Sequence, residues 1–127
     1  MQAKWKLIML AALGVSAMAG ATELTIHLNG SQPLSRKTVQ YECDAQGAAM
    51  GLPAGAFPVE YINGSGNSLV IVPVHEMSLV FANVTSGSGA RYAAGQYIWW
   101  DAAGGVNFYS DSLAGKMQSA CHRVNAK

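Results

Sequence analysis

The three histidines are the side chains best suited to metal binding or acid–base chemistry, but their positions give them no shared role. His75-Glu76 begins like the H-E-x-x-H motif of zinc proteases, yet the fourth residue after His75 is Leu79. That motif needs two histidines one helical turn apart, whereas the sequence around His75 is typical of a turn followed by a strand. His27 and His122 lie far from His75 along the chain. We therefore expect no metal site and no cofactor.

Ser88 and the acidic residues are the remaining candidates for catalysis. Ser88 lies in Gly87-Ser88-Gly89, whereas a nucleophile elbow needs G-x-S-x-G at a turn from a strand into a helix. Neither the spacing nor a following helical pattern is present. A glycosidase needs two carboxylates that face each other, and the seven Asp and Glu residues form no recognisable pair. The sequence thus indicates a protein that is not an enzyme.

Recognition of another molecule is the chemistry favoured by positions 86–101, which read SGSGARYAAGQYIWWD. Glycine at alternate positions lets a backbone approach another surface closely, because no Cβ intervenes. The neighbouring tyrosines and tryptophans offer rigid, amphipathic contact area of the kind found at recognition surfaces. The pattern predicts a protruding loop followed by an aromatic strand. An ordinary hairpin turn followed by a core strand is the alternative.

The aromatic run also allows a second class of function, an exported glycan-binding or adhesive module of the cell envelope. Tyr97, Trp99 and Trp100 would form its sugar-stacking platform. Successive side chains of a strand point to opposite faces, so we expect one of the two tryptophans to lie in the core. A structural or assembly role in the envelope is a third possibility, and an exposed aromatic strand is compatible with a homodimer.

Short strands separated by glycine-rich turns must position this loop. Period-two alternation is clearest at 38–43 and 57–62, and an Asn/Gly/Ser hairpin loop follows at 63–67. Positions 45–57 are rich in Gly and read as a loop. No segment after the N-terminal leader has eleven residues of helical periodicity, so the pattern predicts an all-β sandwich or barrel. The predicted strands are 38–43, 57–62, 68–74, 77–84, 96–100, 106–110 and 116–124.

The N-terminus has the composition of a secretory signal peptide, which we expect to span 1–21. Lys4 and Lys6 precede an apolar run at 7–15, and small-x-small cleavage patterns follow, with cleavage near Gly20 or Thr22. The run is shorter than the ~20 residues of a membrane span. No cysteine lies in or just after it, so we expect no membrane anchor and a periplasmic location. A loose arm at 22–37, with room for one short strand, then leads into a domain at 38–127.

Removing the leader leaves six of the eight Lys and Arg residues against seven Asp and Glu residues. So few scattered charges cannot form a basic surface for nucleic acid. Cys43 and Cys121 are the two cysteines of the chain, and they have neither C-x-x-C spacing nor that of a zinc site. In an oxidising compartment such a pair is expected to form a disulfide. The long loop that it closes suggests a stabilisation of up to about 4–5 kcal/mol.

Several motifs together resemble the MliC/PliC family of bacterial inhibitors of C-type lysozyme. They are Tyr41-x-Cys43, the step Ser88-Gly89-Ala90-Arg91-Tyr92, the pair Trp99-Trp100, and Cys121, within a span from about 38 to 122. The resemblance implies a small antiparallel β-barrel of about eight short strands with one disulfide. It also implies a loop that enters the cleft of C-type lysozyme, braced from behind by Tyr92. The residues it places against lysozyme are Ser86, Gly87, Ser88, Gly89, Ala90, Arg91, Tyr92, Trp100 and Asp101.

One position departs from the family pattern. The family usually has W-W-x-K-G with a lysine that contributes to the contact, and here Ala102 stands where that lysine would be. No other lysine lies nearby. Arg91 is the candidate for a replacement cation.

Overall fold

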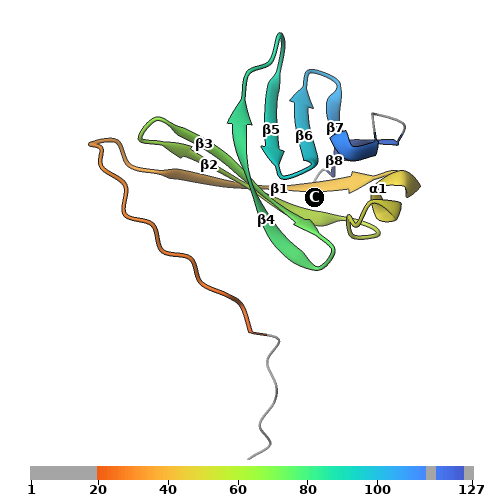
Figure 1. Ribbon diagram of the computed structural model, residues 1–127, viewed down its shortest axis with the longest axis horizontal. Coiled ribbons are helices and arrows are strands. Elements are labelled where there is room, and N and C mark those ends of the chain that lie inside the picture. The colour runs from red at the N-terminus through yellow and green to blue at the C-terminus, as the bar shows by residue number, and fades with distance from the viewer. Residues whose placement is uncertain (1–19, 114–116, 125–127) are drawn as a thin grey trace, which may run out of the picture.

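Eight antiparallel strands form a closed barrel in the computed structural model, in which residues 20–113 and 117–124 are described (Figure 1). Each strand pairs with the next along the chain, and β8 returns to pair with β1. The all-β prediction is confirmed, and the barrel is the architecture adopted. The strands are β1 (Ser35–Cys43), β2 (Phe57–Gly64), β3 (Asn67–Val74), β4 (Met77–Val84), β5 (Ala90–Ala94), β6 (Tyr97–Ala102), β7 (Gly105–Ser110) and β8 (Gln118–Arg123).

The seam between β1 and β8 closes the barrel. Its pairs are Tyr41 with Arg123, Glu42 with His122, and Cys43 with Cys121. The last pair is the disulfide, which joins residues 78 positions apart across a Cα–Cα distance of 4.0 Å. The predicted Cys43–Cys121 bridge is therefore confirmed. It joins β1 and β8, which share only three residue pairs among the described residues.

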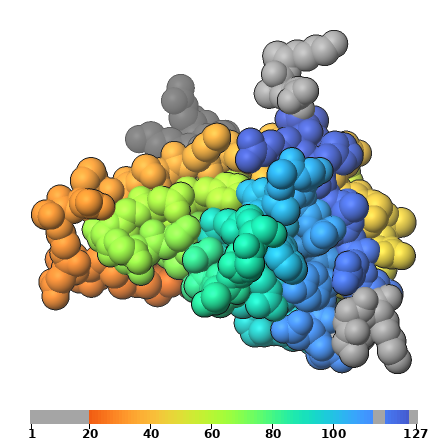
Figure 2. Space-filling view, turned by 90° about the horizontal axis from the view of Figure 1, so that it is seen from above, coloured from red at the N-terminus to blue at the C-terminus, as the bar shows by residue number. Residues whose placement is uncertain are grey.

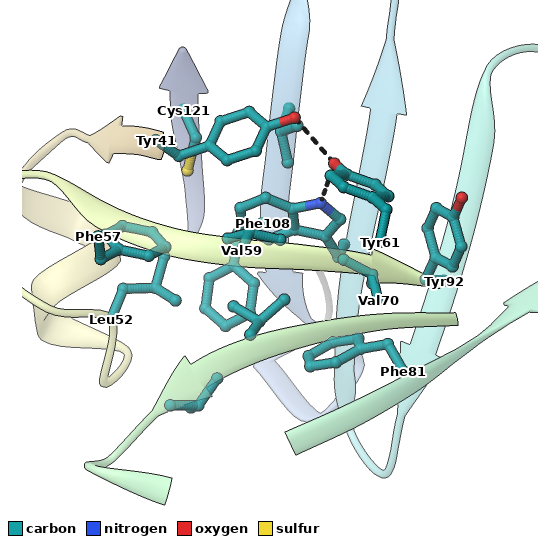
Figure 3. Close-up of a cluster of buried hydrophobic side chains, with 14 of the residues drawn as sticks. Tyr41, Leu52, Phe57, Val59, Tyr61, Val70, Phe81, Tyr92, Phe108 and Cys121 are labelled. Atoms are coloured by element: carbon teal, nitrogen blue, oxygen red, sulfur yellow. Dashed lines mark hydrogen bonds between the residues drawn. The ribbon is translucent and has the colours of Figure 1, made fainter. Parts of the chain in front are cut away.

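Inward-facing side chains of all the long strands fill the barrel (Figure 3). Trp99 is fully buried and packs edge-on against Tyr41, with ring centroids 5.2 Å apart. Phe57, Val59 and Tyr61 face inward from β2, as their period-two spacing predicts. Since buried apolar area is the main source of stability, this aromatic cluster holds the barrel in one register.

A short helix, α1 (Ala45–Ala49), occupies part of the segment predicted to be a loop at 45–57. Asp44 caps it, because its carboxylate accepts hydrogen bonds from the backbone N–H groups of Gln46 and Gly47. The same carboxylate accepts from Ser119 Oγ at 2.7 Å and from the Ala120 N–H at 3.1 Å, both on β8. These bonds, that of Ser119 first, lower the pKa of Asp44. Five helical residues are too few for a periodic signal.

Three other predictions at the edges of elements are wrong. β1 begins at Ser35 rather than at 38, so the arm is shorter than predicted. The arm forms no short strand before Ser35, and its apolar side chains Leu24, Ile26 and Leu28 are exposed. The step from Ala90 to Tyr92 belongs to a strand, β5. The predicted signal peptide lies at its positions 1–19 outside the described residues.

Candidate functional site

The loop between β4 and β5 projects at the top of the barrel in Figure 1. Gly87, Ser88 and Gly89 are exposed, and a Cβ built at Gly87 would have no atom within 4 Å. Ser86 Oγ donates a hydrogen bond to the Gly89 carbonyl at 3.0 Å, which closes the tip on itself. Within the described residues, the Ser88 hydroxyl has no hydrogen-bond partner. The tip is therefore small, exposed and able to offer a free hydroxyl.

Gly89 allows the loop to pack directly on β6. Its φ is +64°, in the left-handed region that favours glycine. A Cβ at this position would collide with the Asp101 carbonyl oxygen and would lie 3.1 Å from Ala102 Cα. Any side chain at position 89 would thus push the tip away from the strand beneath it.

Trp100 holds the loop from the outer face of the barrel. Its Nε1–H donates to the Ser88 carbonyl at 2.9 Å, and the Arg91 guanidinium lies over its ring, 5.9 Å from the centroid. Arg91 Nε in turn donates to the Tyr109 hydroxyl at 3.3 Å. These contacts join β5, β6 and β7 to the tip, so the loop is held in position by side chains of three strands.

Tyr92 supports the same loop from inside the barrel. Its side chain is 5% exposed, its ring packs edge-on against Tyr61, and its hydroxyl lies 3.3 Å from Ser68 Oγ. The side chain of Tyr92 therefore points into the barrel, behind the loop, and not toward the solvent.

A hydrogen-bond network inside the barrel mouth fixes the strand on which the loop packs. The Tyr61 hydroxyl donates to Asp101 Oδ2 at 3.0 Å. Its oxygen accepts from Trp99 Nε1 at 3.1 Å and lies 2.8 Å from the Tyr41 hydroxyl, as Figure 3 shows for the two tyrosines. Because the single proton of Tyr61 goes to Asp101, Tyr41 must donate to Tyr61. Burial, followed by the Tyr41 hydrogen bond, raises the pKa of Tyr61, which therefore stays a neutral donor.

A depression of about 460 Å³ lies beside the loop, between the β6–β7 turn and the end of β8. Figure 2 views this end, with the teal β4–β5 loop, the blue β6–β7 turn and the darker blue end of β8 on one face. Arg123 is exposed at the edge of this depression, and hydrogen bonding with Tyr41 raises its pKa. The depression is lined by Tyr41, Asp101, Ala102, Ala103, Gly104, Gly105, His122 and Arg123.

The predicted site residues fall into two groups. Ser86 to Gly89, Trp100 and Asp101 meet at the loop, whereas Ala90 and Arg91 lie behind it on β5 and Tyr92 faces the core. Sequence reasoning missed the hydrogen bond of Tyr61 to Asp101 and the place of Arg123 at the depression. The alternation of β2 marks Tyr61 as inward-facing, but no sequence pattern links it to Asp101, forty residues away.

The sugar platform of the alternative hypothesis is not formed. Trp99 is fully buried, and Trp100 lies on the opposite face of β6. Tyr97 stacks on Phe108, with centroids 5.6 Å apart. The expectation that one tryptophan lies in the core is confirmed, and for this reason the three aromatic rings share no surface.

The described residues contain neither a candidate metal site nor a membrane-spanning helix. No group of three or more His, Cys, Asp or Glu side chains could hold a metal ion there. In the same residues, no helix has the length and apolarity to cross a membrane.

Comparison with known proteins gives one family and a few relatives. Residues 41–112 match the family described as MliC, membrane-bound lysozyme-inhibitor of c-type lysozyme. The membrane-bound lysozyme inhibitor of C-type lysozyme of Pseudomonas aeruginosa is 42% identical over 90 residues, which are 70% of this chain. The protein of that name from Cupriavidus necator is 29% identical over 92 residues, or 72% of this chain. The chain covers 65% and 66% of the length of these two relatives.

A solved structure extends the likeness to three dimensions. It is the crystal structure of Pseudomonas aeruginosa MliC in complex with hen egg white lysozyme. The match has a TM-score of 0.64 and 36% sequence identity, and it covers 83% of this chain and 99% of that one.

Proposed function

The chain belongs to the MliC family of lysozyme inhibitors, and we propose that it inhibits a C-type lysozyme by inserting the loop at 86–92 into the active-site cleft. The observation that carries the proposal is the exposed Gly87-Ser88-Gly89 tip, held by Trp100 and by the backbone of β6. Support also comes from the similar fold of a protein crystallised with hen egg white lysozyme.

The chemistry of the cleft suits such a tip. C-type lysozyme uses two carboxylates in a groove, one as an acid and the other as a nucleophile or stabiliser. A tip without bulky side chains can reach them, and the free Ser88 hydroxyl and loop N–H groups can donate hydrogen bonds. Bonds to an ionised carboxylate are the strong kind. The inhibitor itself does no chemistry, because blocking the substrate is sufficient.

Preorganisation of the loop is the second physical requirement. The bonds from Ser86 and Trp100 already fix the tip in the free protein. A loop held in its bound shape loses little conformational entropy on docking, so the affinity can exceed what the small contact area suggests. Arg91, Trp100 and Asp101 act in this proposal as supports of Ser88 as well as contacts.

We further propose that the protein acts in the periplasm after export. The predicted signal peptide at 1–21, without a cysteine for lipid attachment, supports a location without a membrane anchor. Its relatives carry the description membrane-bound. Mass spectrometry of the protein purified from periplasmic and membrane fractions gives the mature N-terminus and any attached lipid.

The experiment that tests inhibition is lysis of a peptidoglycan suspension by a C-type lysozyme with increasing amounts of purified protein. We expect lysis to fall as the protein is added, and full lysis at a large molar excess of the protein would contradict the proposal. Gel filtration of the protein, alone and mixed with lysozyme, measures both complex formation and the homodimer suggested by the sequence.

A further inference from the structure

The depression beside the loop is continuous with the proposed lysozyme-binding surface. Ala102 belongs to both, since it lines the depression and lies 3.3 Å from where a Cβ of Gly89 would be. The methyl group of Ala102 fills little space on this side of the depression. A partner that receives the tip of the loop therefore covers the opening of the depression as well.

Arg123 is the cation on the rim of this depression. It follows Cys121 by two residues on β8, where the disulfide and the pairing with Tyr41 fix its backbone. Its guanidinium carries five N–H donors, and Tyr41, its neighbour across the seam, lines the same depression. Among residues 20–113 and 117–124, no carboxylate lies within ion-pair distance of Arg123, whereas Arg36 pairs with Glu60 at 3.4 Å.

Besides Arg123 and Tyr41, the titratable side chains that line the depression are Asp101 and His122. The negative charge of Asp101 helps to raise the pKa of Arg123, after the larger effect of Tyr41. Its carboxylate accepts a hydrogen bond from the Tyr61 hydroxyl and forms no ion pair with Arg123 among the described residues. The imidazole of His122 lies at the edge of the depression as well. Arg91 lies over Trp100 and donates to Tyr109, so it is directed to the outer face of the loop. Arg123 is thus the guanidinium that faces the depression.

We infer that Arg123 binds a carboxylate of the lysozyme in this depression, as a second anchor beside the Ser88 tip. The inference rests on the proposed inhibition and names the charged contact that accompanies it. The groove of C-type lysozyme is acidic at its catalytic centre, and a guanidinium binds a carboxylate through two parallel hydrogen bonds. Arg123 would contact the partner from β8. The β6–β7 turn lies between Arg123 and the β4–β5 loop.

The test measures the inhibition constant of the full-length mature protein against a C-type lysozyme at low and at high salt. We expect Arg123→Gln to weaken inhibition about tenfold at low salt, the effect of losing one charged hydrogen bond. The difference from wild type should shrink as salt is added. Arg36→Gln is the matched control, because it removes the same charge from an exposed cation of β1; we expect it to leave inhibition unchanged.

A second pair of variants covers the case in which Arg123→Gln weakens the seam between β1 and β8. Ala102→Glu places a carboxylate in the depression and keeps the Arg123 side chain, and Ala102→Gln is its neutral counterpart. We expect Ala102→Glu to inhibit about tenfold less well than Ala102→Gln, because Arg123 pairs with the new carboxylate instead of the partner's. Melting temperatures show that all four variants are folded.

The failures of the two proposals are distinguishable. If the wild-type protein does not inhibit, the proposed function and the inference fail together. If the wild type inhibits while folded Arg123→Gln inhibits equally well, only the inference is overturned. Equal inhibition by Ala102→Glu and Ala102→Gln overturns it too, as does an equal loss with Arg36→Gln, which would indicate an effect of net charge.

Discussion

Two loops of this barrel have nearly the same composition but different surroundings. The β2–β3 turn, Ser65-Gly66, lies within the segment Asn63-Gly64-Ser65-Gly66-Asn67, and the β4–β5 loop contains Ser86-Gly87-Ser88-Gly89. In the first turn, Ser65 Oγ donates to the Gln32 carbonyl at 2.6 Å. In the second loop, the Ser88 carbonyl accepts a hydrogen bond from Trp100, and the Ser88 hydroxyl has no partner among the described residues.

The difference between the loops comes from what lies beside each of them. Gly64 packs against the backbone of Pro33, so the β2–β3 turn supports the start of β1. Gly89 packs against β6, whose Trp100 and Asp101 hold the β4–β5 loop outward. The comparison shows that serine and glycine content predicts a turn, whereas the neighbouring strand decides whether its hydroxyl is used internally or offered to a partner.

Adding one methyl group to each loop should give the largest difference between them. Gly89→Ala and Gly66→Ala both place a side chain at positive φ, +64° and +78°, but only at position 89 would the Cβ meet backbone atoms. We expect Gly89→Ala to weaken lysozyme inhibition about a hundredfold, since roughly 2.7 kcal/mol of binding energy is lost when the tip is displaced. Gly66→Ala should inhibit like wild type, and equal inhibition constants for the two variants would contradict the role of the β6 contact.

Removing one hydroxyl from each loop should separate binding from stability. Ser88→Ala is expected to weaken inhibition about tenfold and to leave thermal stability unchanged, because the hydroxyl bonds only to the partner. Ser65→Ala should do the reverse, lowering the free energy of unfolding by about 1 kcal/mol through loss of its bond to Gln32. The inhibition assay and urea denaturation measure the two effects; a loss of inhibition with Ser65→Ala would argue against the assignment of the loop.

A smaller effect is expected from the bond that holds the tip. Trp100→Phe keeps an aromatic ring beneath Arg91 but removes the Nε1–H that donates to the Ser88 carbonyl. The loop then becomes more mobile, and we expect inhibition to weaken about fivefold, or roughly 1 kcal/mol. Association and dissociation rates from surface plasmon resonance would detect the change, and unchanged rates would mean that the tip needs no support from Trp100.

A change far from both loops should leave inhibition unaffected. Asp44→Ala removes the cap of α1 and leaves the buried hydroxyl of Ser119 without its acceptor, so we expect stability to fall by about 1–2 kcal/mol. Because folding lowers the pKa of Asp44, its contribution is complete above about pH 4 and is lost as the pH falls further, through the pKa of the folded state. Acid denaturation of wild type and variant should therefore converge at low pH, and parallel curves would exclude this linkage.

The sequence predicts this fold well where the signal is local. Alternation in β1 and β2, the turn at 63–67 and the burial of one tryptophan follow from side-chain period and turn chemistry. It fails for α1, where five residues give no periodic pattern, and for positions 24–28, whose apolar alternation finds no strand to pair with. The sequence does not predict β5 as a strand, because its Ala-rich sequence has weak strand propensity.

The candidate site divides in the same way. Positions 86–92 stand out by composition, and the family motif marks the same stretch. The bond of Tyr61 to Asp101 and the place of Arg123 beside Ala102 depend on how β2, β6 and β8 meet once the barrel closes. Such contacts join residues tens of positions apart, so no short motif contains them.

The bridge between Cys43 and Cys121 has a consequence for where the protein can work. It fastens a seam of three residue pairs, one of which joins Arg123 to Tyr41. In a reducing cytoplasm the seam would lose its covalent fastening, and the end of β8 could separate from Tyr41. We expect the fully assembled binding face to exist only after the chain has passed into an oxidising compartment, so that export itself acts as the activating step.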